Sequence, residues 1–479
     1  MNKSLIRFIL CRVMQFEGIF LMLPVIVSLI YKEKTGIWFL ITAATVFLLG
    51  TIGSLFKPKS KVFYAREGFV TVSLSWILLS LIGAVPFTVS GEIPSYVDAV
   101  FETVSGFTTT GASILSDVEA LSKTAMFWRC FTNWVGGMGV LVFIMAVLPL
   151  AGSHNMHLMR AESTGAEVGK LVPRVKTTAT ILYSIYFGLT VVLVVCFLCA
   201  GLPLYKALVL SFSTMGTGGF ADINASLGGY STTVQTIAII FMILCGINFN
   251  AYFLLLKRRG KEFFKLEEVR VYLFIMFLSA AAITLQIRGS FASIREAFHH
   301  ALFQVVSIMT TTGFSSMDFD VWPMLAKVIL LFLMVVGGCA GSTAGGLKVS
   351  RVMVLFRSLG REISHLTHPR SVKKIRLNGQ SVSEETVRSV GSFLIAYVIL
   401  VMLSVFIVSK ENFDFSSTFS AVLASVGNIG PGLGVAGPTG NFSSFSDVSK
   451  ITLIFDMLAG RLEIYPMLVL FYVGTWRKS

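Results

Sequence analysis

The sequence has little charge. Only 13% of its 479 residues are Asp, Glu, Lys or Arg, against 54% hydrophobic residues, and the mean hydropathy is +0.79. Soluble domains carry about 25% charged residues. This shortage excludes an ordinary soluble protein and predicts an integral membrane protein before any motif is considered.

Cysteine and histidine are also scarce, with six of each. All six cysteines lie in or beside apolar runs, so they do not form a secreted disulfide framework. Cys196 and Cys199 have Cys-x-x-Cys spacing, but no basic or polar neighbour lowers a thiol pKa there, which favours core packing over redox chemistry. Two histidine pairs lack Cys, Asp or Glu partners at metal-ligand spacing, so we expect no metal cluster at either: His154 with His157, and His299 with His300.

Catalytic groups are missing from the apolar runs. These runs contain no nucleophile with a base, no paired carboxylates and no metal cluster, which argues against an intramembrane enzyme. The glycine-rich stretches 136–139 and 337–348 do not predict a nucleotide site either, because no strand precedes them and no Gly-Lys-Ser/Thr follows. We therefore expect no enzyme activity and no organic cofactor.

Long apolar runs, in contrast, are abundant. A bilayer core of roughly 30 Å needs about 20 apolar residues per helix, and we assign spans near 12–30, 37–56, 67–90, 125–150, 178–201, 232–256, 269–288, 323–356, 386–409 and 448–475. The first is interpreted as a retained helix, because no Ala-x-Ala-like signal cleavage site follows it. Four segments of about half that length are expected to re-enter on the side they came from: 96–107, 203–215, 295–309 and 415–426. The predicted fold class is all-α, with ten transmembrane helices and four re-entrant pore helices.

The net charge of +14 would suggest a nucleic-acid partner in a soluble protein. Here the placement of the basic residues explains it. When the ten spans are threaded, most of the 39 Lys and Arg residues fall on one side, which the positive-inside rule assigns to the cytoplasm together with both termini. We therefore expect no nucleic-acid partner.

A short Thr- and Gly-rich pattern recurs four times at intervals of roughly a hundred residues, the length of a domain repeat. Each copy follows one of the short apolar segments and precedes a long run. The copies are 108–111, 216–219, 310–313 and 427–430. A single copy could be a helix terminus with a glycine cap, but four copies on the same side predict four loops around one pore.

Irregular backbone inside the bilayer must line water or protein. Glycine lets a backbone turn its carbonyls towards a pore axis at positive φ, and rings of carbonyls can replace the hydration shell of a potassium ion. The C-terminal ends of four short helices would add partial negative charge that favours a cation. The candidate ion-binding residues are Thr109, Thr110, Gly111, Thr217, Gly218, Gly219, Thr311, Thr312, Gly313, Asn428, Ile429 and Gly430.

A second glycine-rich segment interrupts the run 323–356. Its small residues could serve close helix packing, but a helix break at mid-membrane is tolerated only along a cavity, so we expect this segment in the pore beneath the four loops. The candidate gate residues are Gly337, Gly338, Gly341, Ser342, Thr343, Gly345 and Gly346, with Arg461. Arg461, taken as the one basic residue within a span, either pairs with Asp456 or Glu463 or presents a fixed positive charge to the pore.

These motifs resemble the Trk/Ktr/HKT superfamily of potassium transporters, most closely the bacterial Trk membrane subunits of the TrkH/TrkG type. The resemblance covers nearly the whole chain and rests on 104–113, 213–220, 309–315, 427–432, 337–348 and 460–463. It implies that Gly111, Gly219, Gly313 and Gly430 are the filter glycines, and that the segment from about Gly337 to Gly346 is an intramembrane gate.

The resemblance also implies a domain organisation. It comprises two extra N-terminal helices (1–60), four pore repeats (61–155, 170–258, 265–356 and 386–479) and a cytoplasmic arm (357–385). Members of the family form homodimers on a cytosolic ring of nucleotide-binding regulatory subunits, so both partners are implied here, as is the inner membrane of a bacterium. Since this chain has no nucleotide motif, any nucleotide control would come from the ring.

The expected function is potassium uptake, with potassium ions bound in the filter. The fourth loop is the most divergent, with Asn428, Ile429 and then Pro431, and predicts weaker discrimination against sodium than in a symmetric tetramer. Coupling of potassium to protons or sodium remains open, as does a secondary transporter of a small organic substrate, although the parallel repeats weigh against the latter. Glu102 is expected to support the first loop from behind by accepting hydrogen bonds.

Overall fold

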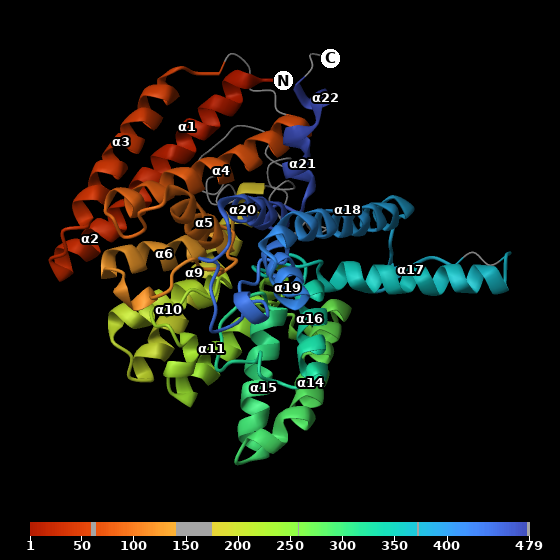
Figure 1. Cartoon of the computed structure of the whole chain (residues 1–479). Coiled ribbons are helices and arrows are strands. Elements are labelled where there is room, and N and C mark those ends of the chain that lie inside the picture. The colour runs from red at the N-terminus through yellow and green to blue at the C-terminus, as the bar shows by residue number, and fades with distance from the viewer. Residues whose placement is uncertain (59–63, 140–174, 257, 371–372, 477–479) are drawn as a thin grey trace.

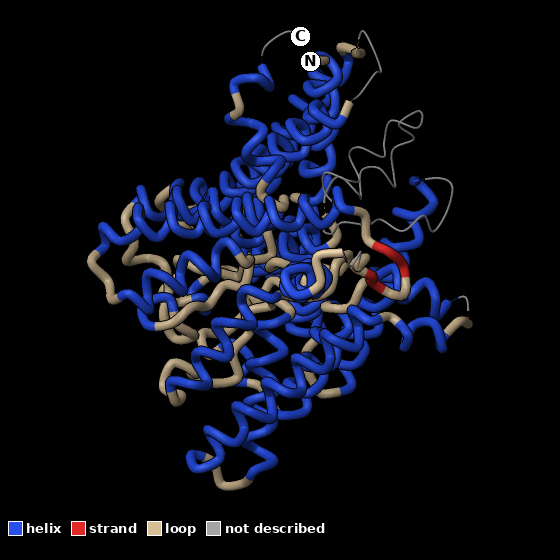
Figure 2. Tube along the Cα trace, turned by 90° about the vertical axis from the view of Figure 1, so that its right-hand side faces the viewer, coloured by secondary structure: helices blue, strands red, loops and turns tan. Residues whose placement is uncertain are grey.

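The computed structural model describes residues 1–58, 64–139, 175–256, 258–370 and 373–476, and the account below concerns these residues. Among them the chain is almost entirely helical (Figure 1; Figure 2). The helices are α1 Lys3–Phe20, α2 Met22–Tyr31, α3 Gly36–Leu55, α4 Ala65–Val89, α5 Tyr96–Phe107, α6 Lys123–Gly137, α9 Val175–Cys199, α10 Leu204–Gly216, α11 Thr232–Cys245, α12 Phe249–Leu256, α13 Gly260–Lys265, α14 Glu267–Ile287, α15 Ile294–Met309, α16 Met324–Val336, α17 Val349–Thr367, α18 Glu384–Val408, α19 Phe415–Val426, α20 Asp447–Arg461, α21 Tyr465–Phe471 and α22 Val473–Trp476. The strands β1 Arg376–Leu377 and β2 Gln380–Ser381 form one antiparallel hairpin.

Six helical segments are long and apolar enough to cross a membrane, and a seventh is added if one bent pair counts as a span. The six are Lys3–Tyr31, Gly36–Leu55, Ala65–Val89, Thr180–Cys199, Glu267–Ser290 and Glu384–Glu411. The prediction of an all-α membrane protein is therefore confirmed. The further spans that we assigned from the sequence do not meet this criterion of length and composition in the described residues.

Three assigned spans are not single straight helices. The span at 232–256 consists of α11 and α12, which meet at an angle of 94° across residues 246–248. The span at 448–475 is interrupted after α20, where Glu463 and Ile464 have φ of 58° and 63°. The span at 323–356 is broken between α16 and α17, as its glycines predicted. In the span at 125–150, α6 ends at Gly137, and residues 140–150 lie outside the described part of the chain.

Four helices, α5, α10, α15 and α19, correspond to the short apolar segments; α5 and α19 lie near the middle of the molecule in Figure 1, and α15 extends towards its lower end. Their bounds agree with the short apolar segments in the sequence to within one residue. Serine or aspartate caps begin three of them, because Ser95, Ser293 and Asp414 each accept a hydrogen bond from a backbone N–H in the first turn. The fourth, α10, begins directly after Pro203.

The helices of successive repeats pack in a closed cycle. Each of these four helices packs against the helix that follows the loop of the preceding repeat, in the pairs α6 with α10, α11 with α15, α16 with α19, and α20 with α5. The last pair joins the end of the chain to its first repeat. A central site bounded by all four repeats follows from this packing. Helix α17, in contrast, extends away from the cycle (Figure 1).

Candidate ion pathway

The loops that follow the four short helices have one backbone conformation. In each loop, the residue two positions before the last glycine of the motif is left-handed, with φ of 55° at Thr109, 53° at Thr217, 54° at Thr311 and 55° at Asn428. The last glycines also have positive φ, of 79° at Gly111, 70° at Gly219, 85° at Gly313 and 96° at Gly430. The four segments therefore adopt the same backbone conformation at these positions, although their sequences differ.

The same hydrogen bond holds each loop to its short helix. The N–H of the residue just before the last glycine donates to a carbonyl five residues earlier in the chain. These bonds are Thr110 to Ser105 at 2.8 Å, Gly218 to Ser213 at 2.9 Å, Thr312 to Ser307 at 2.8 Å and Ile429 to Ala424 at 2.8 Å. Bonds of this type satisfy the last carbonyls of a helix when the chain turns away.

The four glycines meet in a ring. A Cβ atom added to Gly111 would collide with the carbonyl oxygen of Gly218, and the same relation continues around the cycle. The remaining collisions are Gly219 with Thr312, Gly313 with Ile429, and Gly430 with Thr110. Each loop thus places a glycine against the carbonyl of the next loop, and the fourth returns to the first. Neither the positive φ nor the available space suits a side chain at these positions.

The left-handed position suits one divergent residue of the fourth loop, Asn428. A β-branched threonine is strained in this conformation, whereas asparagine tolerates it. Asn428 also uses its amide, because its Nδ2 atom donates to Thr110 Oγ1 at 3.0 Å and to the Met457 carbonyl at 2.8 Å. The residue that looked like a departure from the pattern therefore joins the fourth loop to the first and to α20.

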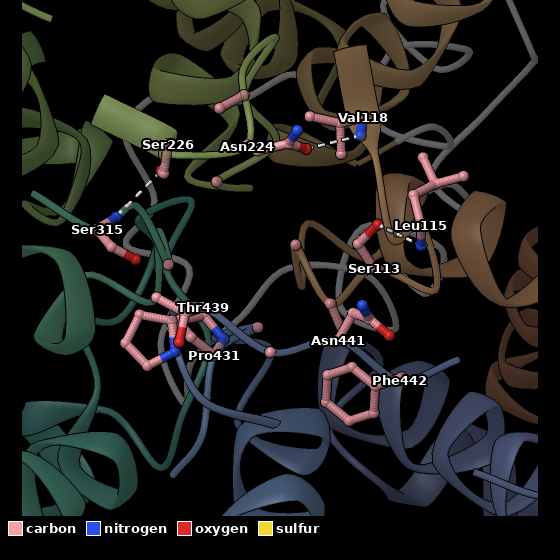
Figure 3. Close-up of a pocket in the computed structure, with 18 of the residues that line it drawn as sticks. Ser113, Leu115, Val118, Asn224, Ser226, Ser315, Pro431, Thr439, Asn441 and Phe442 are labelled. Carbon is pink, nitrogen blue, oxygen red and sulfur yellow. Dashed lines mark hydrogen bonds between the residues drawn. The ribbon is translucent and has the colours of Figure 1, made fainter. Parts of the chain in front are cut away.

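A cavity of about 150 Å³ lies over the ring and is lined by all four of its glycines (Figure 3). Its walls are the segments after the glycines, which hydrogen bonds connect from repeat to repeat. The bonds are Val118 N to Asn224 Oδ1 at 2.8 Å, Ser315 N to Ser226 Oγ at 3.1 Å, Gly434 N to Asp320 Oδ2 at 3.1 Å and Phe442 N to the Ser113 carbonyl at 2.8 Å. A hydrogen bond from the Asn224 amide lowers the pKa of Asp117 in these segments, which favours its charged form.

The glycine-rich segment between α16 and α17 lies next to the ring. Its Gly345 N–H donates to Thr311 Oγ1 at 2.6 Å, and a Cβ atom on Gly345 would collide with the Gly427 carbonyl oxygen. Thr343 is fully buried, and Ser342, which is almost fully buried, donates to the Cys339 carbonyl at 2.6 Å. The segment therefore contacts the third and fourth loops directly.

The break between α11 and α12 is hydrogen-bonded to this segment. The Gly246 carbonyl accepts from Cys339 N at 2.9 Å, and Phe249 N donates to the Gly341 carbonyl at 2.9 Å. A helix end that is buried needs such partners, so the two interruptions satisfy each other. We did not anticipate this break from the sequence, although Gly246 and Asn248 were signals of it.

Arg461 points to backbone carbonyls. Its Nη1 donates to the Thr343 carbonyl at 2.7 Å, and its Nη2 donates to the carbonyls of Gly136 and Gly137 at 2.5 and 2.8 Å. The latter two lie at the C-terminal end of α6, where the helix dipole attracts a cation. The carboxylates that we weighed as partners bind other groups. Glu463 pairs with Arg351 at 2.5 Å, and Asp456 accepts from Ser404 at 2.7 Å.

The TrkH family, described as cation transport proteins, matches residues 37–475. This chain belongs to the TrkH family. It is 37% identical to the Trk system potassium uptake protein TrkH of Salmonella typhimurium over 487 residues, with 99% of each chain covered, and 33% identical to TrkG of Escherichia coli K12, with 95% of each covered. The crystal structure of the potassium transporter TrkH from Vibrio parahaemolyticus matches with a TM-score of 0.89 at 34% identity, over 99% of each chain. The chain is thus a transport protein and not an enzyme.

A buried ion pair distinguishes the first repeat of this TrkH-family chain. Glu102 accepts from Ser113 Oγ at 2.9 Å and from Ile114 N at 3.0 Å, and it forms a salt bridge with Arg129 Nε at 2.6 Å. The guanidinium also donates to the Ala221 carbonyl at 3.1 Å and so links the first two loops. Our statement that Arg461 is the one basic residue within a span was wrong, because Arg129 is also buried, in α6. Its partner Glu102 comes 27 residues earlier, which local spacing did not reveal.

Asn428→Leu should lower the free energy of unfolding by about 2–4 kcal/mol, because leucine loses both amide hydrogen bonds and tolerates left-handed backbone poorly. Thermal unfolding of the purified protein in detergent measures this. The matched control is Asn412→Leu, since Asn412 has φ of 56° but is exposed. Equal losses in both variants would contradict a special role for the Asn428 amide.

Proposed function

We propose that this chain takes up potassium across the cell membrane through a single pore formed by its four repeats, with a selectivity filter of backbone carbonyls. The observation that carries the proposal is the closed ring of four loops, which share one backbone conformation although their sequences differ. The similar proteins from Salmonella typhimurium and Escherichia coli are potassium uptake proteins of the Trk system. The family match also favours a cation over the small organic substrate that the sequence left open.

The proposed filter consists of the twelve residues named from the sequence. Carbonyl oxygens of the positions before and at the glycines would replace water around the ion. The short helices α5, α10, α15 and α19 end at these loops, so the negative ends of their dipoles support cation binding. Four non-identical loops would hold fewer well-ordered ions than a symmetric filter, and so the chain should discriminate less strongly against sodium.

The proposed architecture is ten spans with four re-entrant pore helices, in the repeats 61–155, 170–258, 265–356 and 386–479 after the two N-terminal helices. The distribution of Lys and Arg supports an orientation with both termini and the arm 357–385 in the cytoplasm, and the ring towards the outside. An ion would then enter by the cavity over the ring (Figure 3).

The proposed gate is the glycine-rich segment 337–346 together with Arg461. The segment contacts the ring through the Gly345 N–H, which donates to Thr311 Oγ1, and the lining of the cavity over the ring includes no residue of the segment. Arg461 would add a fixed positive charge beside the ion's path. This charge repels a passing cation, so the cation meets an energy barrier unless the segment moves. Potassium could move alone or be coupled to protons or sodium. Uptake measured with and without a proton or sodium gradient separates these mechanisms, since only coupled uptake depends on the gradient of the second ion.

A homodimer and a cytosolic nucleotide-binding ring are the proposed partners, on the strength of the family resemblance. Helix α17 supports a protein contact because it extends away from the body (Figure 1) and has an exposed apolar stripe. The stripe consists of Phe356, Leu359, Ile363 and Leu366, which are 72%, 58%, 56% and 82% exposed. Residues at this spacing lie on one helix face, which suits a partner rather than water.

The function is tested by potassium or rubidium uptake into liposomes with sodium as competitor, in the wild type and in Gly313→Ser. We expect selective uptake to fall at least about tenfold in the variant, since a distortion of only about 1.4 kcal/mol in ion binding has that effect. Gly91→Ser is the matched control. Gly91 also has positive φ, of 81°, but an added Cβ meets nothing within 4 Å.

Equal uptake by the wild type and Gly313→Ser would contradict the carbonyl filter. Absence of any cation flux from folded wild-type protein, with the cytosolic ring added, would contradict potassium uptake itself. Loss of uptake in Gly91→Ser as well as in Gly313→Ser would indicate general misfolding as the cause, and would remove the support for the ring.

Arg461→Gln should raise basal flux about tenfold, because removal of the positive charge needs to lower the barrier by only about 1.4 kcal/mol for that effect. Glutamine keeps donors for the carbonyls but has no charge. The same liposome assay measures it, with Arg288→Gln at an exposed position as the control. Unchanged or reduced flux from a folded variant would contradict the electrostatic barrier.

Leu366→Asp should convert the proposed dimer to a monomer, because it puts a charge in the apolar stripe of α17. Multi-angle light scattering in detergent measures the mass of the complex. His365→Ala, exposed on the same helix but about 100° around it from Leu366 and away from the stripe, is the control and should remain dimeric. A dimeric Leu366→Asp variant would mean that the stripe does not form the interface.

A further inference from the structure

Two adjacent glutamates begin α14, and they bind different parts of the chain. Glu267 contacts the arm, since its carboxylate accepts from Arg357 Nη2 at 2.9 Å and from Asn378 N at 3.2 Å. Its own N–H donates to Asn378 Oδ1 at 2.7 Å. The hairpin and α17 are therefore both attached to the first residue of α14.

Glu268 binds the glycine-rich segment instead. One carboxylate oxygen, Oε1, accepts from Ala340 N at 2.7 Å and from Ser350 N at 3.2 Å. Ala340 lies in the middle of the segment, and Ser350 lies at the start of α17. A single oxygen thus connects two points of the chain that flank residues 341–349, which include the second half of the segment. The Glu268 side chain is only 7% exposed, so these hydrogen bonds are sheltered from water.

A cavity of about 320 Å³ separates the segment from the hairpin. Its lining includes Glu268, Ala340 and Ser350, together with hairpin residues Leu377, Asn378, Gln380, Ser381 and the following Val382. Packed side chains therefore do not fill the space between the segment and the arm. The start of α14 connects the two, because Glu267 binds the arm and Glu268 binds the segment.

We propose that Glu268 is a positioning residue of the gate, whose carboxylate holds segment 337–346 in its observed conformation beneath the ring. The proposal rests on the gate proposed above. Two backbone N–H groups need an acceptor at this place, and a charged acceptor makes the stronger hydrogen bonds. When the acceptor is lost, the segment loses its attachment to α14 while the ring and Arg461 stay intact.

Basal potassium flux in liposomes tests the proposal with three variants. Glu268→Ala removes the acceptor and should raise basal flux about tenfold, the scale on which one charge-assisted hydrogen bond shifts an equilibrium. Glu268→Asp keeps the charge but is too short to reach both N–H groups, so it should also raise flux. Glu268→Gln keeps an oxygen at the right distance and loses only the added strength that the charge gives, so its flux should rise clearly less than that of Glu268→Asp. Glu262→Ala is the control, because Glu262 is exposed and pairs with Arg259.

The variants distinguish failure of this proposal from failure of the gate. If Arg461→Gln raises flux while Glu268→Ala and Glu268→Asp behave as the wild type, the role of Glu268 is overturned and the gate stands. If Arg461→Gln, Glu268→Ala and Glu268→Asp all leave the flux unchanged, the proposed gate itself is wrong, and with it the role of Glu268. If Glu268→Ala does not fold, Glu268→Asp against Glu268→Gln still decides, and equal flux in these two overturns the proposal.

Discussion

The close approach of four backbone segments at the central ring is the constraint on which the rest of the structure depends. At Gly111, Gly219, Gly313 and Gly430 each loop lies so near the next that a methyl group cannot be inserted. Backbone carbonyls of Thr110, Gly218, Thr312 and Ile429 are brought close to these glycines, and a buried carbonyl needs a polar partner. The short helices and the closed cycle of helix contacts exist to hold these four segments at that distance.

Several polar side chains serve the same end from behind the ring. Glu102 and Arg129 connect the first two loops, and Asn428 ties the fourth loop to the first. Each replaces water as the partner of a buried backbone or hydroxyl group. Buried polar groups of this kind are costly unless they are fully satisfied, so their presence marks the places where position matters more than stability.

Much of this was predictable from residue order alone. The short helix α5 was expected at 96–107 and is found at Tyr96–Phe107, because the length of its apolar run and the cap at Ser95 are local properties. The bend at residues 246–248 was not predicted, since both sides of it are apolar and the partner of the Gly246 carbonyl is Cys339, far along the chain. Arg129 was overlooked for the same reason. Its charge is balanced by tertiary contact with Glu102, which no local pattern records.

Because one chain supplies all four loops, a single substitution alters one quarter of the ring. In an assembly of identical subunits the same change would be copied four times. The left-handed position illustrates the difference, since it is threonine in three loops and asparagine in the fourth. Each loop can thus change independently of the other three. The geometry of the ring can therefore be altered one loop at a time.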